Sequence, residues 1–187
     1  WLVSYLISIP VLAVSTISYS GRRFSQPTRS LGFSTAGVQW FPQTVFFSIV
    51  LAGFFYFYLA FVDSNESIIF FKNAEFWKTS SETLGPVFFI FSLVLVYGII
   101  APLVEEMFFR GFVDQALRRI GMNGFWGIIV NGALFSLFYP WIAIPPVMLM
   151  GFFLTLLFRR SETLWPCILS HSIFNFFIVF LCAWNLR

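Results

Sequence analysis

The chain has 187 residues, of which 59% are hydrophobic, 22% are aromatic and only 10% are charged. A soluble domain carries roughly 25% charged residues, so this composition excludes one, and the aromatic content excludes intrinsic disorder. The net charge of +3 is small, and arginines in short loops indicate membrane orientation, not nucleic-acid binding. The long apolar stretches do not alternate as barrel strands do. We therefore predict an all-α, polytopic transmembrane helical bundle that forms a single domain over residues 1–187.

Apolar stretches follow one another along the chain, each close to the roughly 20 residues that a membrane-spanning helix needs. We predict about six spans, at residues 1–19, 45–62, 86–106, 123–139, 144–158 and 163–184. Pro102 lies inside the third stretch and is expected to kink or interrupt that helix. The first stretch lacks the basic leader and cleavage site of a signal peptide, so we interpret it as a span. Because the chain starts at Trp1, we expect more spans upstream.

Three arginine clusters alternate with the predicted spans. They are Arg22, Arg23 and Arg29; Arg118 and Arg119; and Arg159 and Arg160. If the spans are counted alternately, all three clusters fall on one side, and the acidic segment at residues 63–82 falls on the other. The positive-inside rule places the arginine side in the cytoplasm. We therefore expect an integral protein of a bacterial-type inner membrane or an organellar membrane, with the Arg118–Arg119 and Arg159–Arg160 loops cytoplasmic.

Ionisable side chains inside membrane spans are costly and mark candidate functional sites. On a helix, Glu106, Arg110 and Asp114 are spaced four residues apart, so they share a face and can form a self-neutralising ladder. Glu105 lies about 100° around the helix from Glu106, away from this ladder. A carboxylate there suits a general base that activates water. The alternative is a purely structural ion-pair ladder at the membrane interface, with Glu105 facing lipid headgroups.

A second polar pair lies in the last apolar stretch. His171 and Asn175 are four residues apart and share a helix face, where they can stabilise an oxyanion or orient a water molecule. The alternative is an interhelical hydrogen bond that only holds the bundle together. His171 is the single histidine, and Cys167 and Cys182 lie apart in the same stretch. A closed zinc site would need carboxylates for most of its ligands, so we expect no metal and no cofactor.

The order of these residues resembles a known family. The sequence Glu105-Glu106-Met-Phe-Phe-Arg110, a phenylalanine motif in a later span, and His171-Ser-Ile-Phe-Asn175 are similar to the EExxxR, FxxxH and HxxxN motifs of the CPBP family. This family comprises CAAX prenyl-endopeptidase and bacteriocin-processing (Abi) membrane proteins. The patch at residues 29–33 is also similar to the family, and the resemblance extends over about residues 29–175.

The resemblance implies a fold, a reaction and residue roles. It implies a CPBP-like transmembrane domain that cleaves a membrane-proximal peptide bond by metal-independent attack of water. Glu105 would be the general base, and Glu106 with Arg110 would be a structural pair. His171 and Asn175 would position the water or stabilise the oxyanion.

The middle motif departs from the family. The chain reads Phe135-Ser-Leu-Phe-Tyr139, so a tyrosine stands where the family has histidine. A phenol with a pKa of about 10 is neutral at pH 7, so it can donate a hydrogen bond to an oxyanion but carries protons poorly. Loss of a positioned acid–base group costs about 10²–10⁴-fold in rate. Asn131, two turns earlier, adds a polar group but not a base. We therefore predict reduced or absent proteolysis.

Two functions remain open, so the sequence does not decide whether the protein is an enzyme. The favoured one is a proteolytically silent membrane scaffold or subunit that contacts lipids and a membrane protein partner or larger membrane assembly. The alternative is an active intramembrane endopeptidase with a peptide substrate, in which Tyr139 is a weak electrophilic helper. Proteolysis predicts an open cavity where Glu105, Tyr139 and His171 converge, whereas a scaffold predicts that this space is filled. Neither involves nucleic acid.

Overall fold

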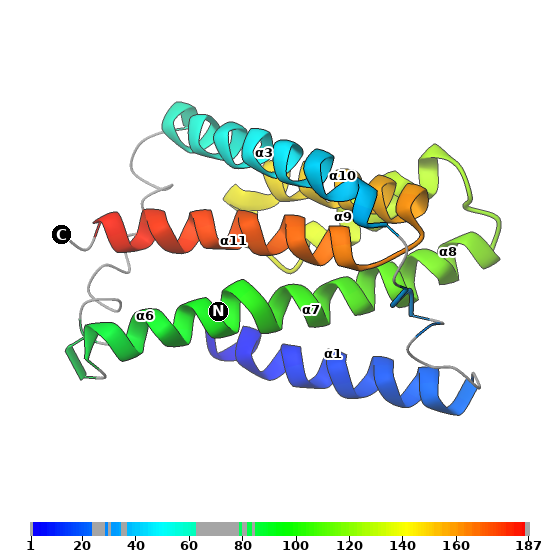
Figure 1. Ribbon diagram of the computed structural model, residues 1–187, viewed down its shortest axis with the longest axis horizontal. Helices are drawn as coiled ribbons and strands as arrows, with labels where there is room; N and C mark the ends of the chain where they lie inside the picture. Colours follow the sequence, from blue (N-terminus) through cyan, green and yellow to red (C-terminus); the bar gives the residue numbers. More distant parts are fainter. Residues whose placement is uncertain are drawn as a thin grey trace.

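The computed structural model describes residues 2–23, 29, 31–34, 37–62, 79, 82–83 and 85–185, and it describes side-chain surroundings for all of these except residues 2–7, 38, 59–60 and 181–185. Every regular element within these ranges is a helix. The long helices run parallel or antiparallel to one another along the long axis of one bundle (Figure 1). The structure therefore confirms the predicted all-α helical bundle.

Most of the described chain lies in helices. The α-helices are α1 (Leu2–Arg23), α3 (Phe41–Val62), α6 (Pro86–Leu95), α7 (Ala101–Glu106), α8 (Gln115–Arg119), α9 (Phe125–Ser136), α10 (Ile144–Ser161) and α11 (Trp165–Asn185). The segments η1 (Val38–Trp40) and η4 (Trp141–Ala143) are 3₁₀-helices, and η2 (Val96–Ile100) and η3 (Met107–Asp114) are π-helices.

One continuous helix runs from Pro86 to Arg119 through α6, η2, α7, η3 and α8. The helix is not interrupted at Pro102, and the kink expected there stays a prediction. A proline ring clashes with the carbonyl four residues before it, which here belongs to Gly98. Gly98 lies in the wider π-helical turn η2, where the Ala101 N–H donates to the Val96 carbonyl five residues back. The helix accommodates Pro102 by this change of hydrogen-bond register.

Among the described residues, three helices are long and apolar enough to cross a membrane on their own: Phe41–Tyr58, Pro86–Arg119 and Trp141–Ser161. Phe125–Ser136 and Trp165–Phe180 are shorter apolar helices. The first predicted span is a helix that continues to Arg23, so Arg22 and Arg23 lie in its last turn and not in a loop. Cations are favourable there because the C-terminal end of a helix carries partial negative charge. The number of membrane crossings stays a prediction.

The bundle is packed around α10, whose inward face is fully covered. Helix α9 lies along α10, α11 lies against α3 and α10, and α1 packs on α7 and η3. Phe135, Leu154 and Leu164 are completely buried in the core between these helices. Helix α3 instead exposes large aromatic side chains, including Phe57 and Phe61. An apolar exterior is what a helix needs in contact with lipid tails.

The C-terminal ends of α1, α8 and α10 lie at the same end of the bundle (Figure 1). These helix ends carry Arg22 and Arg23, Arg118 and Arg119, and Arg159 and Arg160. We call this the arginine end. The acidic segment at residues 63–82 lies almost entirely outside the described residues, and the cytoplasmic placement of the arginine end stays a prediction.

Candidate active site

The predicted site residues of the first and third motifs come together inside the bundle. Glu105 and Glu106 close α7, near the middle of the long helix, and they are 3% and 0% exposed. His171, which is fully buried, faces them from α11. Tyr139 reaches the same place from the turn that follows α9. Three segments that are distant in sequence therefore converge on one polar cluster in an apolar core.

Glu106 is the centre of a buried charged network. Its Oε1 accepts a hydrogen bond from Arg110 Nη1 at 3.0 Å and lies 2.8 Å from His171 Nδ1. Arg110 also donates from Nη2 to the Gly151 carbonyl at 3.2 Å, and its guanidinium lies 4.6 Å from the centre of the Phe135 ring. A buried cation over an aromatic face gains a cation–π attraction. This network holds α7, η3, α10 and α11 in one register.

Glu105 lies on the other side of the same histidine. The Tyr139 hydroxyl donates to Glu105 Oε2 at 3.2 Å and lies 3.4 Å from His171 Nε2. Glu105 Oε2 and His171 Nε2 are 3.9 Å apart. An ionised carboxylate only accepts hydrogen bonds, so the imidazole presents a proton on Nδ1 to Glu106. In the neutral ring, the Nε2 lone pair then faces Tyr139 and Glu105.

Asp114 does not belong to this network, which corrects the predicted ladder. Its Oδ1 accepts hydrogen bonds from Arg159 Nη2 at 2.7 Å and Nε at 3.0 Å, and its Oδ2 lies 3.3 Å from Arg118 Nε. Within the described part of the chain, Arg110 and Asp114 form no ion pair. The reason is that Arg159 of α10 and Arg118 of α8 already occupy both carboxylate oxygens of Asp114.

Arg159 is a site-supporting residue that the sequence interpretation missed. Beyond Asp114, it also donates to the backbone carbonyls of Asn123 and Gly124. It thereby ties the end of α10 to the loop between α8 and α9. Its position beside Arg160 at the end of an apolar stretch indicated only membrane orientation. The available signal was Asp114, a lone acid at the end of another span that needed a partner.

The two asparagines near the site contact backbone groups. Asn175 Nδ2 donates to the Tyr97 carbonyl in η2 at 2.8 Å. Asn131 is fully buried and donates from Nδ2 to the Phe109 carbonyl and to Thr155 Oγ1, both at 3.2 Å. These contacts fasten the two π-helical segments to α11 and α9. The oxyanion role of Asn175 stays a prediction. Asn131 instead joins α9 to η3 and α10 through its hydrogen bonds.

Groups that could bind a metal are not gathered at the site. The described residues contain no cluster of three or more His, Cys, Asp or Glu side chains placed to hold a metal ion. Cys167 is fully buried against α10, where its thiol lies 3.4 Å from the Leu154 carbonyl. The side chain of Cys182 lies outside the described residues. The chemistry that this cluster offers is therefore that of a carboxylate, an imidazole and a phenol.

Fold and site together define a polytopic membrane protein with a buried carboxylate–histidine cluster between its helices. Residues 86–177 match the family model described as type II CAAX prenyl endopeptidase Rce1-like. Over residues 86–177, this match confirms the resemblance to the CPBP family that the motifs indicated. No curated protein and no solved structure matches the chain. The matched segment contains all residues of the cluster, whereas α1 and α3 precede it. Together with the long apolar helices, this match identifies an integral membrane protein.

Proposed function

We propose that this protein is a proteolytically silent CPBP-family member that serves as a scaffold or subunit in the membrane. The observation that carries the proposal is the position of the Tyr139 hydroxyl, 3.2 Å from Glu105 Oε2 and 3.4 Å from His171 Nε2. An attacking water must lie within about 2.6–3.2 Å of its general base. The phenol oxygen occupies the position between base and imidazole that such a water would take.

The chemistry of a phenol supports a silent site. In hydrolysis, the oxygen of the attacking water ends up in the product. The phenol oxygen is covalently bound to the protein, so it cannot take this part. By donating to Glu105, it also engages the carboxylate oxygen that faces His171. Glu105 itself is only 3% exposed, which favours a packed site over one that admits a peptide bond. A hydrogen-bonded cluster that joins α7, the α9 turn and α11 is well suited to hold a scaffold rigid.

One observation favours the alternative of an active endopeptidase. Glu106 contacts His171 and pairs with Arg110, and His171 Nε2 lies 3.9 Å from Glu105 Oε2. If the Tyr139 side chain rotates away, a water between Glu105 and His171 could attack a peptide carbonyl. Glu105 would take its proton, and the displaced Tyr139 hydroxyl would donate to the oxyanion. We rank this second, because it requires a buried hydrogen-bonded side chain to move.

The two functions are separated by proteolysis in reconstituted liposomes. Wild type, Glu105→Ala, Tyr139→His and the Tyr139→His/Glu105→Ala double variant are assayed against prenylated and transmembrane peptides. We expect wild type to release no more product than Glu105→Ala. We expect Tyr139→His to raise product by about 10²-fold or more, and the double variant to lose that gain. Cleavage by wild type that Glu105→Ala abolishes would establish the active endopeptidase instead.

The scaffold function is tested in native membranes. Under the proposal, a membrane protein partner is crosslinked and recovered equally with wild type and with Glu105→Gln, because binding does not depend on a catalytic base. Glu105→Gln keeps an acceptor oxygen for the Tyr139 hydroxyl, so the cluster stays intact. Recovery of processed peptide substrates with wild type alone would contradict the proposal.

A further inference from the structure

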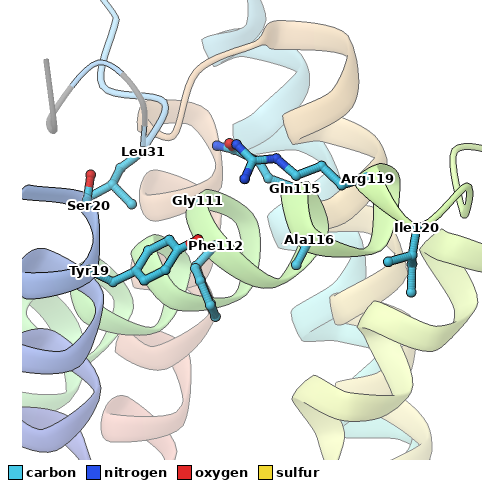
Figure 2. A pocket seen from close by; sticks show the side chains of 9 residues that line it. All are labelled: Tyr19, Ser20, Leu31, Gly111, Phe112, Gln115, Ala116, Arg119 and Ile120. Carbon is cyan, nitrogen blue, oxygen red and sulfur yellow. The ribbon is translucent and has the colours of Figure 1, made fainter. Parts of the chain in front are cut away.

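A cavity of about 260 Å³ opens at the arginine end, between α1 and the segment formed by η3 and α8 (Figure 2). Tyr19 and Ser20 line it from α1, and Phe112, Gln115 and Arg119 line it from η3 and α8. None of the residues of the Glu105 cluster belongs to its lining. We call it the α1–α8 groove, and it is separate from the candidate active site.

The lining of the groove is divided into an apolar part and a polar part. Phe112, Ala116 and Ile120 point to one side of the helix, while Gln115 and Arg119 lie together on the other side (Figure 2). The Tyr19 and Phe112 rings meet edge to face, with their centroids 5.1 Å apart. Ile120 is 74% exposed. An apolar wall beside a guanidinium suits a ligand with an anionic head and a hydrocarbon body.

Charge near the groove is strongly cationic. Arg119 lines the groove, and Arg22 and Arg23 are exposed in the last turn of α1. Arg23 follows Tyr19 by four residues and therefore shares its helix face. The nearby acid Asp114 is fully buried and already shared by Arg159 and Arg118. The mouth of the groove thus complements a negatively charged group.

We infer that the α1–α8 groove binds the headgroup of an anionic phospholipid. The phosphate oxygens accept hydrogen bonds from Arg119 and from the arginines that end α1, and the first carbons of an acyl chain lie along Tyr19, Phe112 and Ile120. Arginines at helix ends lie at the depth of lipid headgroups, and basic pockets between transmembrane helices attract anionic headgroups. Pockets for whole small molecules begin at about 300 Å³, so this smaller groove fits a headgroup.

Lipid binding is measured on the purified full chain in neutral detergent by native mass spectrometry. Phosphatidylglycerol and phosphatidylcholine are titrated against wild type, Arg119→Gln, Arg23→Gln and the double variant. We expect wild type to prefer phosphatidylglycerol. We expect each single variant to weaken that binding about fivefold, which is about 1 kcal/mol per arginine near the headgroups. The double variant should weaken it about 25-fold.

Two further variants separate the groove from general surface charge. Arg160→Gln removes an exposed arginine at the same end of the bundle but outside the groove, and we expect less than a twofold effect. Ala116→Phe keeps every charge and fills the apolar part of the groove, and we expect it to abolish the phosphatidylglycerol preference. Equal losses in Arg160→Gln and Arg119→Gln, or an Ala116→Phe variant that binds like wild type, would overturn the inference.

Competition by glycerol phosphate identifies which part of the lipid is bound. We expect free glycerol phosphate to displace phosphatidylglycerol only at large excess, because it lacks the acyl chains that contact the apolar wall. Displacement at equal concentration would show a site for a free phosphate compound and contradict a lipid site. The lipid inference does not depend on proteolytic silence, since none of the variants touches Glu105, Tyr139 or His171.

Discussion

At the residue scale, the two carboxylates of the cluster, Glu105 and Glu106, differ in the side chains that bind them. Glu106 is bound by both Arg110 and His171 through the same oxygen, so its charge is compensated inside the core. Glu105 instead meets a phenol where the family motif has a second imidazole. A buried pair that loses one partner leaves an uncompensated charge, which costs about 3–5 kcal/mol. We therefore expect Glu106 and Arg110 to stabilise the fold whether or not the protein is an enzyme.

Removal of the Tyr139 hydroxyl tests the bridge directly. Tyr139→Phe keeps the ring but removes the hydrogen bond to Glu105, so we expect the free energy of unfolding to fall by about 1–3 kcal/mol. A change of 1 kcal/mol lowers Tm by about 2–4 °C in a chain of this size. Thermal unfolding in detergent measures the shift. Tyr56→Phe, at an exposed tyrosine of α3, is the matched control and should leave Tm unchanged. A Tyr139→Phe variant as stable as wild type would contradict the bridge.

At the element scale, α9 and α10 cross where two glycines meet. A Cβ on Gly151 would lie 2.8 Å from the Gly132 Cα, and a Cβ on Gly132 would strike the Phe152 ring and lie 3.0 Å from its backbone nitrogen. Gly151 also offers its carbonyl to Arg110 and Thr155. The close contact of these helices therefore sets the position of the groups that orient Arg110. Small residues serve this purpose at many helix contacts in membranes.

Gly151→Ala should separate these helices. Because the obstacle is backbone and not a flexible side chain, we expect a loss of about 1–3 kcal/mol in stability. Gly53→Ala is the matched control, since a Cβ on Gly53 in α3 meets nothing within 4 Å. That variant should be neutral or gain up to about 1 kcal/mol from helix propensity. Denaturation in mixed detergent micelles compares the two. Equal stability of both variants would show that the crossing tolerates a methyl group.

How far the sequence predicts these elements depends on the kind of interaction. Apolar runs and the prolines that start α6 and α10 predicted the positions of the helices to within a few residues. Both signals can be read from the local sequence. The π-helical segments were not predicted, because hydropathy does not encode a hydrogen-bond register. The pairing of Asp114 with Arg159 was not predicted either, because these residues lie on different helices, 45 positions apart in the sequence. Tyr139 and Glu105 are 34 residues apart in the sequence, and their contact depends on the turn after α9.

At the scale of the whole molecule, charge is distributed asymmetrically between the two ends of the bundle. The arginine end gathers the C-terminal ends of α1, α8 and α10. The link between α9 and α10, residues 137–143, contains Pro140 and Trp141 and carries no charge. Arginines near span ends stay on the cytoplasmic side during insertion, so the fold as a whole predicts one orientation. The same orientation would place the α1–α8 groove at the cytoplasmic leaflet, where anionic lipids are enriched.

Site-directed labelling checks this orientation. In a chain with Cys167→Ala and Cys182→Ala, single cysteines are introduced by Ile120→Cys and Trp141→Cys, at side chains that are 74% and 69% exposed. We expect a membrane-impermeant thiol reagent to label Ile120→Cys only in inside-out vesicles and Trp141→Cys only in right-side-out vesicles. Detergent-solubilised protein, in which both should react, controls for accessibility. Labelling of both from one side would show that α9 does not cross the membrane, because these two positions flank it. Labelling on exchanged sides would keep the bundle and reverse its orientation, which would place the α1–α8 groove at the opposite leaflet.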